Sequence, residues 1–214
     1  MKHTQNMTPA VTPTMSPAMA DAIAALQNGQ GVIVADDPNR ENECDFVFAA
    51  ETLTEEQMAL MIRHGSGIVC AVITQDRADS LGLPPMVADN ASPYKTPFTI
   101  SVEAKTGVTT GVSAHDRTRT ITTLCAASAS ATDLRSPGHV FPLIAHPEGL
   151  RARRGHTEAT LALMQLAGLT PTGVLCEAMT DDGRMATYSD IADLKAASGM
   201  PLVTIDEIIA CIVV

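Results

Sequence analysis

The sequence predicts an α+β fold, a three-layer α/β/α sandwich around a mixed sheet in a single domain. Helical and strand-like patterns alternate along the 214 residues. Their order is not a regular βαβ series, so we expect a mixed sheet rather than a purely parallel one. Hydrophobic residues make up 45% of the chain and are divided among short segments. This distribution suits one sizeable core and contains no run long enough to span a membrane.

The N-terminal residues 1–17 are rich in Thr, Pro and Met, and we expect them to form a disordered arm before a domain of residues 18–214. The first helix should begin at the end of this arm. Ser16 can cap it, Pro17 suits its first position, and Gly29 suits the position just past its end.

Capping patterns predict two further helices. Thr54 and Gln57 form a capping box for a helix that stops at Gly65, and Ser113 with Asp116 can cap a helix that runs to about residue 130. Apolar runs between turn residues predict the strands. The expected strands cover residues 31–35, 45–50, 67–74, 98–102, 140–144 and 173–177, with one more near residue 202, and the remaining helices cover 157–167 and begin at about 189.

Composition excludes several classes of protein. The formal charge of −10, the absence of Trp and an aromatic content of 3% argue against a nucleic-acid partner, which would require a basic surface. The five cysteines are scattered and contain no C-x-x-C pair, so neither a disulfide framework nor a zinc knuckle is indicated. We expect a cytoplasmic protein with no membrane partner.

Residues 36–45 hold five carboxylates in ten positions, directly after an apolar strand pattern. Such a density is costly unless the charges are paired or coordinated. If residues 41–45 are extended, Glu41, Glu43 and Asp45 project to one side and offer three oxygen ligands to a divalent cation. The alternative is a solvated acidic turn.

Residues 151–159 supply the basic patch that an anionic substrate would need. Three arginines precede a predicted helix N-terminus, where free backbone N–H groups and the Thr157 hydroxyl suit a phosphate. His156 could add a nitrogen ligand, which Mn²⁺ accepts and Mg²⁺ tolerates. The alternative is that the arginines are ordinary surface residues and His156 is structural.

His139 and Glu177 complete the candidates, because both lie at predicted strand ends, where a sheet presents catalytic side chains. Each could equally be structural. The chain contains no P-loop, no G-x-G-x-x-G and no G-x-S-x-G motif, so nucleotide binding and serine hydrolysis have no support.

These motifs resemble, in order and over nearly all of residues 19–207, those of the 3,4-dihydroxy-2-butanone 4-phosphate synthase family of riboflavin biosynthesis. The matching blocks are Arg40-Glu41-Asn42-Glu43 with Asp45; Gln57-Met58-Ala59 through Arg63-His64-Gly65-Ser66-Gly67; Gly107 to Arg117; Arg135-Ser136-Pro137-Gly138-His139; Arg154-Gly155-His156-Thr157-Glu158-Ala159; and Val174-Leu175-Cys176-Glu177.

The resemblance implies a lyase that converts D-ribulose 5-phosphate to L-3,4-dihydroxy-2-butanone 4-phosphate and formate, as a homodimer with shared active sites. It implies Mg²⁺ or Mn²⁺ bound by Glu41 and His156, and catalytic roles for His139 and Glu177. Glu43 is our further candidate for proton transfer. The implied substrate-binding residues are Arg40, Glu41, Asp45, Arg153, Arg154, Gly155, His156, Thr157 and Glu177.

Two departures from the family pattern stand out. Cys44 occupies a position where the family usually has glycine, so we expect a thiol beside the site. The C-terminal tail is shorter and more apolar than the polar helical ending expected. Two alternative functions remain: another metal-dependent sugar-phosphate isomerase or aldolase, which would release no formate, and a nucleotide- or RNA-binding module of similar fold.

Overall fold

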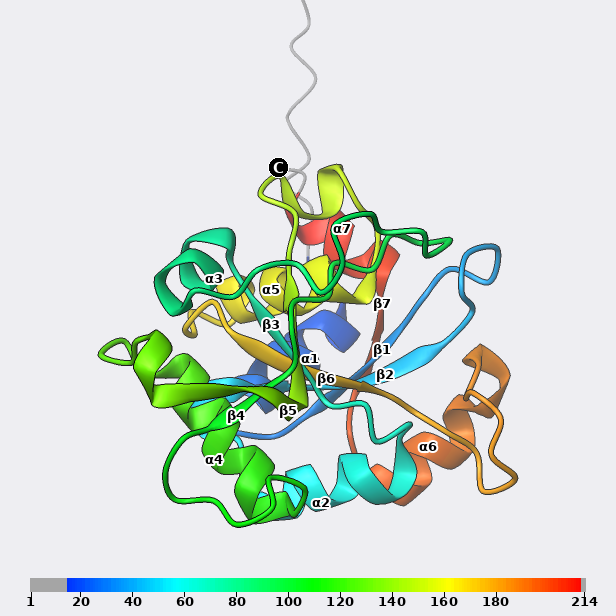
Figure 1. Cartoon of the computed structure of the whole chain (residues 1–214). Coiled ribbons are helices and arrows are strands. Elements are labelled where there is room, and N and C mark those ends of the chain that lie inside the picture. Colours follow the sequence, from blue (N-terminus) through cyan, green and yellow to red (C-terminus); the bar gives the residue numbers. More distant parts are fainter. Residues whose placement is uncertain (1–14, 213–214) are drawn as a thin grey trace, which may run out of the picture.

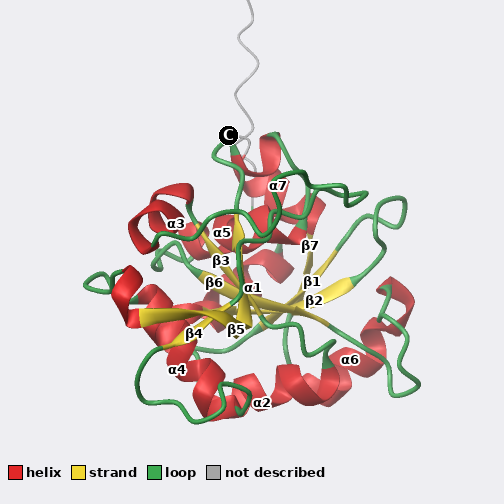
Figure 2. Cartoon of the chain, in the orientation of Figure 1, coloured by secondary structure: helices red, strands yellow, loops and turns green. Residues whose placement is uncertain are grey.

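The computed structural model describes residues 15–212, so the expected arm lies almost entirely outside the described residues. Within them, one seven-stranded mixed sheet has the order β4-β5-β3-β6-β2-β1-β7 and is covered by helices on both faces (Figures 1 and 2). The α/β/α sandwich is therefore confirmed.

Seven strands and seven α-helices make up the described part of the chain. The strands are β1 (Val32–Ala35), β2 (Cys44–Ala49), β3 (Cys70–Ile73), β4 (Val102–Ala104), β5 (Leu134–Ile144), β6 (Gly173–Glu177) and β7 (Leu202–Thr204). The helices are α1 (Pro17–Gln27), α2 (Glu55–His64), α3 (Gln75–Leu81), α4 (Ala114–Cys125), α5 (His156–Leu166), α6 (Ile191–Ser198) and α7 (Ile205–Ile212).

The sheet combines both kinds of strand pairing. Strands β1, β2, β6 and β3 pair antiparallel in succession, as do β4 and β5. The pairs β3–β5 and β1–β7 are parallel. This combination follows from the irregular order of helices and strands in the sequence.

Strand β2 shows how the layers form, because its side chains alternate between two separate cores. Phe46 and Phe48 pack with residues of α2 and α4 on one face of the sheet. Val47 and Ala49 pack with α1, α5 and α7 on the other face. The alternation also fixes the environment of Asp45, which must share the face that carries α5.

The predicted caps are present. The Ser16 hydroxyl accepts from Met19 N at 3.2 Å, and Thr54 and Gln57 form the capping box of α2. Helix α4, however, ends at Cys125 rather than near residue 130. The Arg77 guanidinium donates to the carbonyls of Leu124 and Ala126, and so satisfies the end of the helix.

One other expectation was wrong, and two helices were not expected. The strand expected at 98–102 lies at Val102–Ala104, because residues 98 and 99 form only isolated bridges. Helix α3 was missed, although Thr74 caps it and Gly82 ends it with φ of +64°. The apolar tail forms α7, where Thr204 and Glu207 make a capping arrangement and Ile208 enters the core.

Candidate active site

The acidic segment between β1 and β2 is a turn and not an extended strand. Asn42 has φ of +55°, and the N–H groups of Arg40 and Asn42 both donate to the Asp37 carbonyl. This reversal brings Glu41 back toward Asp36, whose carboxylate accepts from Glu41 N at 3.0 Å. The expected alignment of Glu41, Glu43 and Asp45 on one side is therefore wrong, because it required extended backbone through residue 42.

A group of three possible metal ligands forms around His156, the first residue of α5. Ligand atoms of Asp36, Glu41 and His156 all lie within 4.8 Å of one another. The sequence prediction included Glu41 and His156 as ligands but missed Asp36. Asp36 belonged to the acidic run, and its position directly after a buried strand was the signal that could have identified it.

Asp45 and Glu177 continue this group across the sheet. They are opposite each other in the β2–β6 register, so their side chains emerge on the same face. The carboxylate Oδ2 of Asp45 lies 3.7 Å from His156 Nδ1. Glu177 accepts a hydrogen bond of 2.6 Å from the Ser66 hydroxyl, a partner that sequence reasoning did not assign.

Burial and mutual repulsion shift the pKa values of the acids in this group. Burial raises the pKa of Asp45 to about 7, although His156 opposes the shift. Burial also raises the pKa of Glu43, and the neighbouring charges of Glu41 and Glu177 add to the effect. For Glu41 burial acts in the same direction, but His156, whose Nδ1 lies 3.8 Å from Glu41 Oε2, and the adjacent Arg40 lower its pKa overall.

His156 experiences the opposite balance. Burial lowers the pKa of its imidazole, but the surrounding carboxylates of Asp45, Glu41 and Asp36 outweigh burial and raise it to about 9. Two buried atoms of the group, His156 Nε2 and Asp45 Oδ1, have no hydrogen-bond partner within residues 15–212. Clustered oxygen ligands around an imidazole with an unpartnered nitrogen fit a divalent cation of the Mg²⁺ or Mn²⁺ type.

The basic half of the site lies at the N-terminus of α5. Gly155 is the N-cap and provides no side-chain cap, so the N–H groups of the first turn remain available to an anion. A Cβ at Gly155 would approach Arg153 Nη1 to 2.5 Å and Arg40 Nη2 to 3.1 Å. Two guanidinium groups therefore border this helix end, with buried Thr157 in the first turn.

Contacts beyond this helix end hold the arginines in place. Arg153 Nη1 donates to the buried carboxylate of Glu158 at 2.7 Å. Tyr94, in the loop of residues 84–97, donates from its hydroxyl to the Arg40 carbonyl at 3.0 Å and has its ring 5.1 Å from the Arg40 guanidinium carbon. Nothing in the sequence pattern indicated Tyr94. Arg154 differs, because it forms an exposed ion pair with Asp206.

His139 is not bonded to the metal-ligand group by any hydrogen bond or ion pair within residues 15–212. His139 lies on β5 and Glu177 at the end of β6, and β3 lies between these two strands in the sheet.

The expectation for Cys44 was wrong. Its side chain is fully buried in the core on the face opposite Asp45, so the thiol does not border the site. Burial raises the pKa of this thiol to about 12. The backbone at Cys44 is regular strand, a conformation that residues other than glycine adopt without strain.

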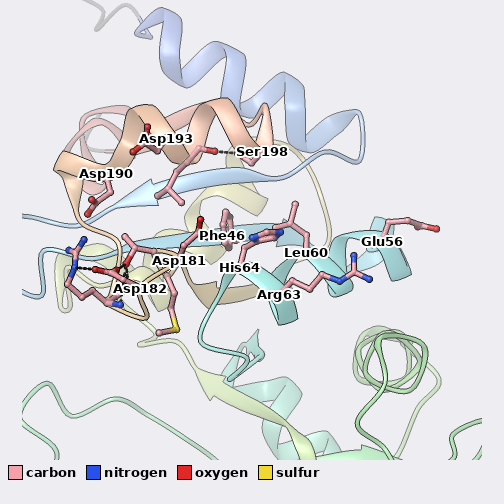
Figure 3. A pocket seen from close by; sticks show the side chains of 14 residues that line it. Phe46, Glu56, Leu60, Arg63, His64, Asp181, Asp182, Asp190, Asp193 and Ser198 are labelled. Atoms are coloured by element: carbon pink, nitrogen blue, oxygen red, sulfur yellow. Dashed lines mark hydrogen bonds and ion pairs between the residues drawn. The ribbon is translucent and has the colours of Figure 1, made fainter.

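A cavity of about 660 Å³ also lies on that opposite face (Figure 3). Figure 3 shows Leu60, Arg63 and His64 of α2 on one side of it, and Asp190 and Asp193 on the other. None of the proposed site residues lines it. Cavity size therefore does not locate the chemistry in this chain, whereas the clustering of acids, imidazole and guanidinium groups does.

The fold and this site define a metal-dependent enzyme that acts on a phosphorylated substrate, because hard metal ligands adjoin an arginine-lined helix N-terminus. Comparison with known proteins identifies the family. The model of the 3,4-dihydroxy-2-butanone 4-phosphate synthase family matches residues 20–211. The chain belongs to this family.

Similar proteins and solved structures agree with this assignment. The synthase of Shewanella halifaxensis is 56% identical over 189 residues, covering 88% of this chain and 89% of the relative, and that of Vibrio harveyi is 55% identical over 188 residues, covering 88% and 82%. A crystal structure of such a synthase with two magnesium ions matches with a TM-score of 0.85 at 44% identity, covering 91% of this chain and 96% of that one.

A two-domain synthase from A. baumannii also matches with a TM-score of 0.85, at 40% identity, and the match covers 89% of this chain and 56% of that one. The family assignment favours neither alternative function considered from the sequence. None of the helices within residues 15–212 combines the length and apolar character required to cross a membrane.

Proposed function

We propose that this chain is the lyase that converts D-ribulose 5-phosphate to L-3,4-dihydroxy-2-butanone 4-phosphate and formate in riboflavin biosynthesis. The observation that carries the proposal is the meeting of Asp36, Glu41 and His156 with Arg40 and Arg153 at one end of α5. A sugar phosphate requires both the metal-ligand group and the arginines, since a cation can bind its carbonyl oxygen and guanidinium groups can bind its phosphate.

Glu41 and His156 would hold Mg²⁺ or Mn²⁺, with Asp36 as a third ligand. The cation would supply positive charge beside the ketone and hydroxyl oxygens of the substrate, where negative charge develops. Because a bound imidazole must be neutral, the proton that His156 retains in the metal-free protein would leave on binding.

The phosphate would be bound by Arg40, Arg153, Arg154 and the first turn of α5, from Gly155 to Thr157. The proposed role of Arg154 requires its exposed side chain to leave Asp206, which costs little because surface ion pairs are weak. Binding energy at this remote end would hold the reacting carbons in register with the acids and limit the escape of reactive intermediates.

Proton transfers would be performed by Glu43, Glu177 and His139, while Asp45 binds substrate hydroxyl groups. The raised pKa of Glu43 makes its carboxylate a better proton acceptor than an ordinary glutamate, which suits a group that takes and returns a proton. Glu177 is held by Ser66 on the same face of the sheet as Asp45. Asp45 and Glu177 would therefore line one end of a substrate whose phosphate lies at α5.

Formate release tests this assignment. Purified protein with ribulose 5-phosphate and Mg²⁺ should produce formate, which formate dehydrogenase would detect, and Glu41→Ala should abolish it. Chelation with EDTA should also stop the reaction, and added Mg²⁺ should restore it. Substrate consumption without formate would instead indicate an isomerase or aldolase.

We further propose a homodimer in which each active site takes residues from both subunits. Two apolar side chains that the described residues expose are Ile68, just before β3, and Val112, beside Gly111, where a Cβ would approach His139 Nδ1, and His139 itself is half-exposed. Burial of such residues against a second copy would enclose His139.

Subunit mixing distinguishes a shared site from an independent one. Glu41→Ala and His139→Ala homodimers should each be inactive. After mixed refolding, a shared site should restore about a quarter of the wild-type activity, because half of the dimers are mixed and each has one intact site. If instead each site takes Glu41 and His139 from the same subunit, every site in a mixed dimer lacks one of them, and mixing would restore no activity.

We also propose that the protein is cytoplasmic. All five cysteines are free thiols, and three of them, Cys44, Cys70 and Cys176, are buried. Free cysteines in this number suit a reducing compartment. Fractionation of the producing cells would test this location.

A further inference from the structure

Glu103 of β4 forms a buried link between two basic side chains of β5. Its Oε2 atom lies 3.0 Å from His139 Nδ1, and its Oε1 atom lies 2.9 Å from Arg135 Nε. The Glu103 side chain is only 11% exposed, whereas that of His139 is 46% exposed. One carboxylate therefore fixes one edge of the imidazole and leaves the rest of the ring open.

The backbone of the sheet is irregular where this link forms. Val102 pairs with Val140, but the next residue, Glu103, pairs with Arg135, so the register shifts between them. A shift of this kind redirects side chains and is frequent beside active sites. It allows Arg135 and His139, four positions apart on β5, to reach the same carboxylate.

Gly111 packs closely against the Glu103–His139 pair. Gly111 has φ of +82°, and a Cβ there would overlap Glu103 Oε2 and approach His139 Nδ1 to 2.7 Å. The Gly111 N–H donates to the buried carboxylate of Asp116 at 3.0 Å, and Asp116 also accepts from Thr109 N and Oγ1. The loop is thus held where only a glycine leaves room for the pair.

We propose that Glu103 is a positioning residue for His139, an inference that rests on the catalytic role proposed for His139. A carboxylate can only accept, so Nδ1 must carry the proton in the bond to Glu103. The neutral ring is thereby held in the Nδ1–H form, with Nε2 as the free nitrogen that exchanges protons with substrate.

The chain provides its own control for this arrangement. His115 Nδ1 lies 2.8 Å from Glu55 Oε1, the same pair of groups at a similar distance. Both of these side chains are largely exposed, at 61% and 54%. Exposed pairs of this type constrain their members weakly, because water competes for both groups. Glu55→Gln is therefore a matched control for Glu103→Gln.

The experiment combines kinetics with ¹⁵N NMR of histidine-labelled protein, recorded at a pH where His139 is neutral. Glu103→Gln should lower kcat about 100-fold, the lower end of what a positioned acid or base contributes. The KM for ribulose 5-phosphate should change by less than about twofold, because ground-state binding is retained. Glutamine has one acceptor oxygen where Glu103 has two, and once that oxygen accepts from Arg135 its NH2 group faces His139, so the His139 resonances should lose their Nδ1–H character. Glu55→Gln should leave kcat and the His139 resonances unchanged.

Loss of the carboxylate could also unfold the protein by leaving Arg135 without a partner. The double variant Glu103→Gln/Arg135→Gln removes both charges and serves if the single variant unfolds. Wild-type kcat with an unchanged His139 tautomer, in whichever variant folds, would overturn the proposal. The variant His139→Ala tests the catalytic role of His139 separately from the positioning role of Glu103. If His139→Ala retains activity, the catalytic role of His139 is wrong. If His139→Ala is inactive but Glu103→Gln is fully active, only the positioning role of Glu103 is rejected.

Discussion

Asp36→Asn should weaken metal binding while leaving the fold intact. The Asp36 carboxylate is 1% exposed, and it accepts from Arg40 Nη1 at 2.7 Å and from Glu41 N at 3.0 Å. Asparagine has nearly the same shape, and its amide oxygen can still accept from Glu41 N. The substitution therefore removes one negative charge and one hard oxygen ligand but keeps the turn that positions Glu41.

The expected loss of affinity follows from these contacts. Asp36 both contributes an oxygen within 4.8 Å of the other ligands and orients Glu41 through the backbone. Removal of one such partner costs about 10- to 100-fold in metal affinity, which corresponds to about 1.4 to 2.8 kcal/mol. The stabilisation of the protein by saturating Mn²⁺ should fall by the same amount at a fixed concentration.

Mn²⁺ titration followed by electron paramagnetic resonance would measure the dissociation constant directly. The control is Asp37→Asn, which makes the same change in net charge one residue away, at an exposed carboxylate that accepts its hydrogen bonds from Asn39 N and Nδ2. Its effect should be less than about threefold, because exposed charges are screened. If both variants weaken Mn²⁺ equally, Asp36 acts only through net charge and its proposed role as a ligand is wrong.

Two further predictions concern stability. Glu158→Ala should lower the free energy of unfolding in urea by about 3–5 kcal/mol, because it leaves Arg153 with an unpaired, partly buried charge. Asp206→Ala removes the exposed partner of Arg154 and should lower it by less than about 1 kcal/mol. Equal losses in the two variants would contradict this reasoning. The metal-free protein should lose unfolding free energy as the pH rises from about 5 to 9, measured by denaturation in EDTA. The folded-state pKa of His156 is raised from 6.5 to about 9 and that of Asp45 from 3.8 to about 7, so both bind protons more tightly when folded, and a flat or rising profile would contradict the assignment.

The sequence predicted the fold best where caps and apolar periodicity agreed. Ser16, Thr54 and Ser113 each begin a helix, because a hydroxyl that accepts from a first-turn N–H is a local signal. Prediction failed where the decisive contact was distant in sequence. The end of α4 depends on Arg77, nearly fifty residues earlier, and no local pattern at residues 126–130 indicated it.

The site shows the same division between local and distant information. The motifs led to the prediction of Glu41, His156, Glu177 and the arginines as site residues, because each lies in a distinctive run of residues. The partners that orient them come from elsewhere in the chain: Ser66 for Glu177, Tyr94 for Arg40 and Glu103 for His139. Tyr94 and Glu103 lie outside the matching blocks; Ser66 lies inside one, but only the fold shows that it donates to Glu177.

The acidic run shows how residues expected to align along an extended segment can instead converge through a turn. Alternation through residues 41–45 required an extended segment, but Asn42 adopts a positive φ that asparagine tolerates better than most residues. The turn is closed by N–H groups of Arg40 and Asn42 on the Asp37 carbonyl. It returns Glu41 to the end of β1, where Asp36 lies, and leaves Asp45 on β2 beside His156. The reversal at Asn42 thus turns a row of repelling charges into a cluster around one imidazole, and that convergence is what a divalent cation requires.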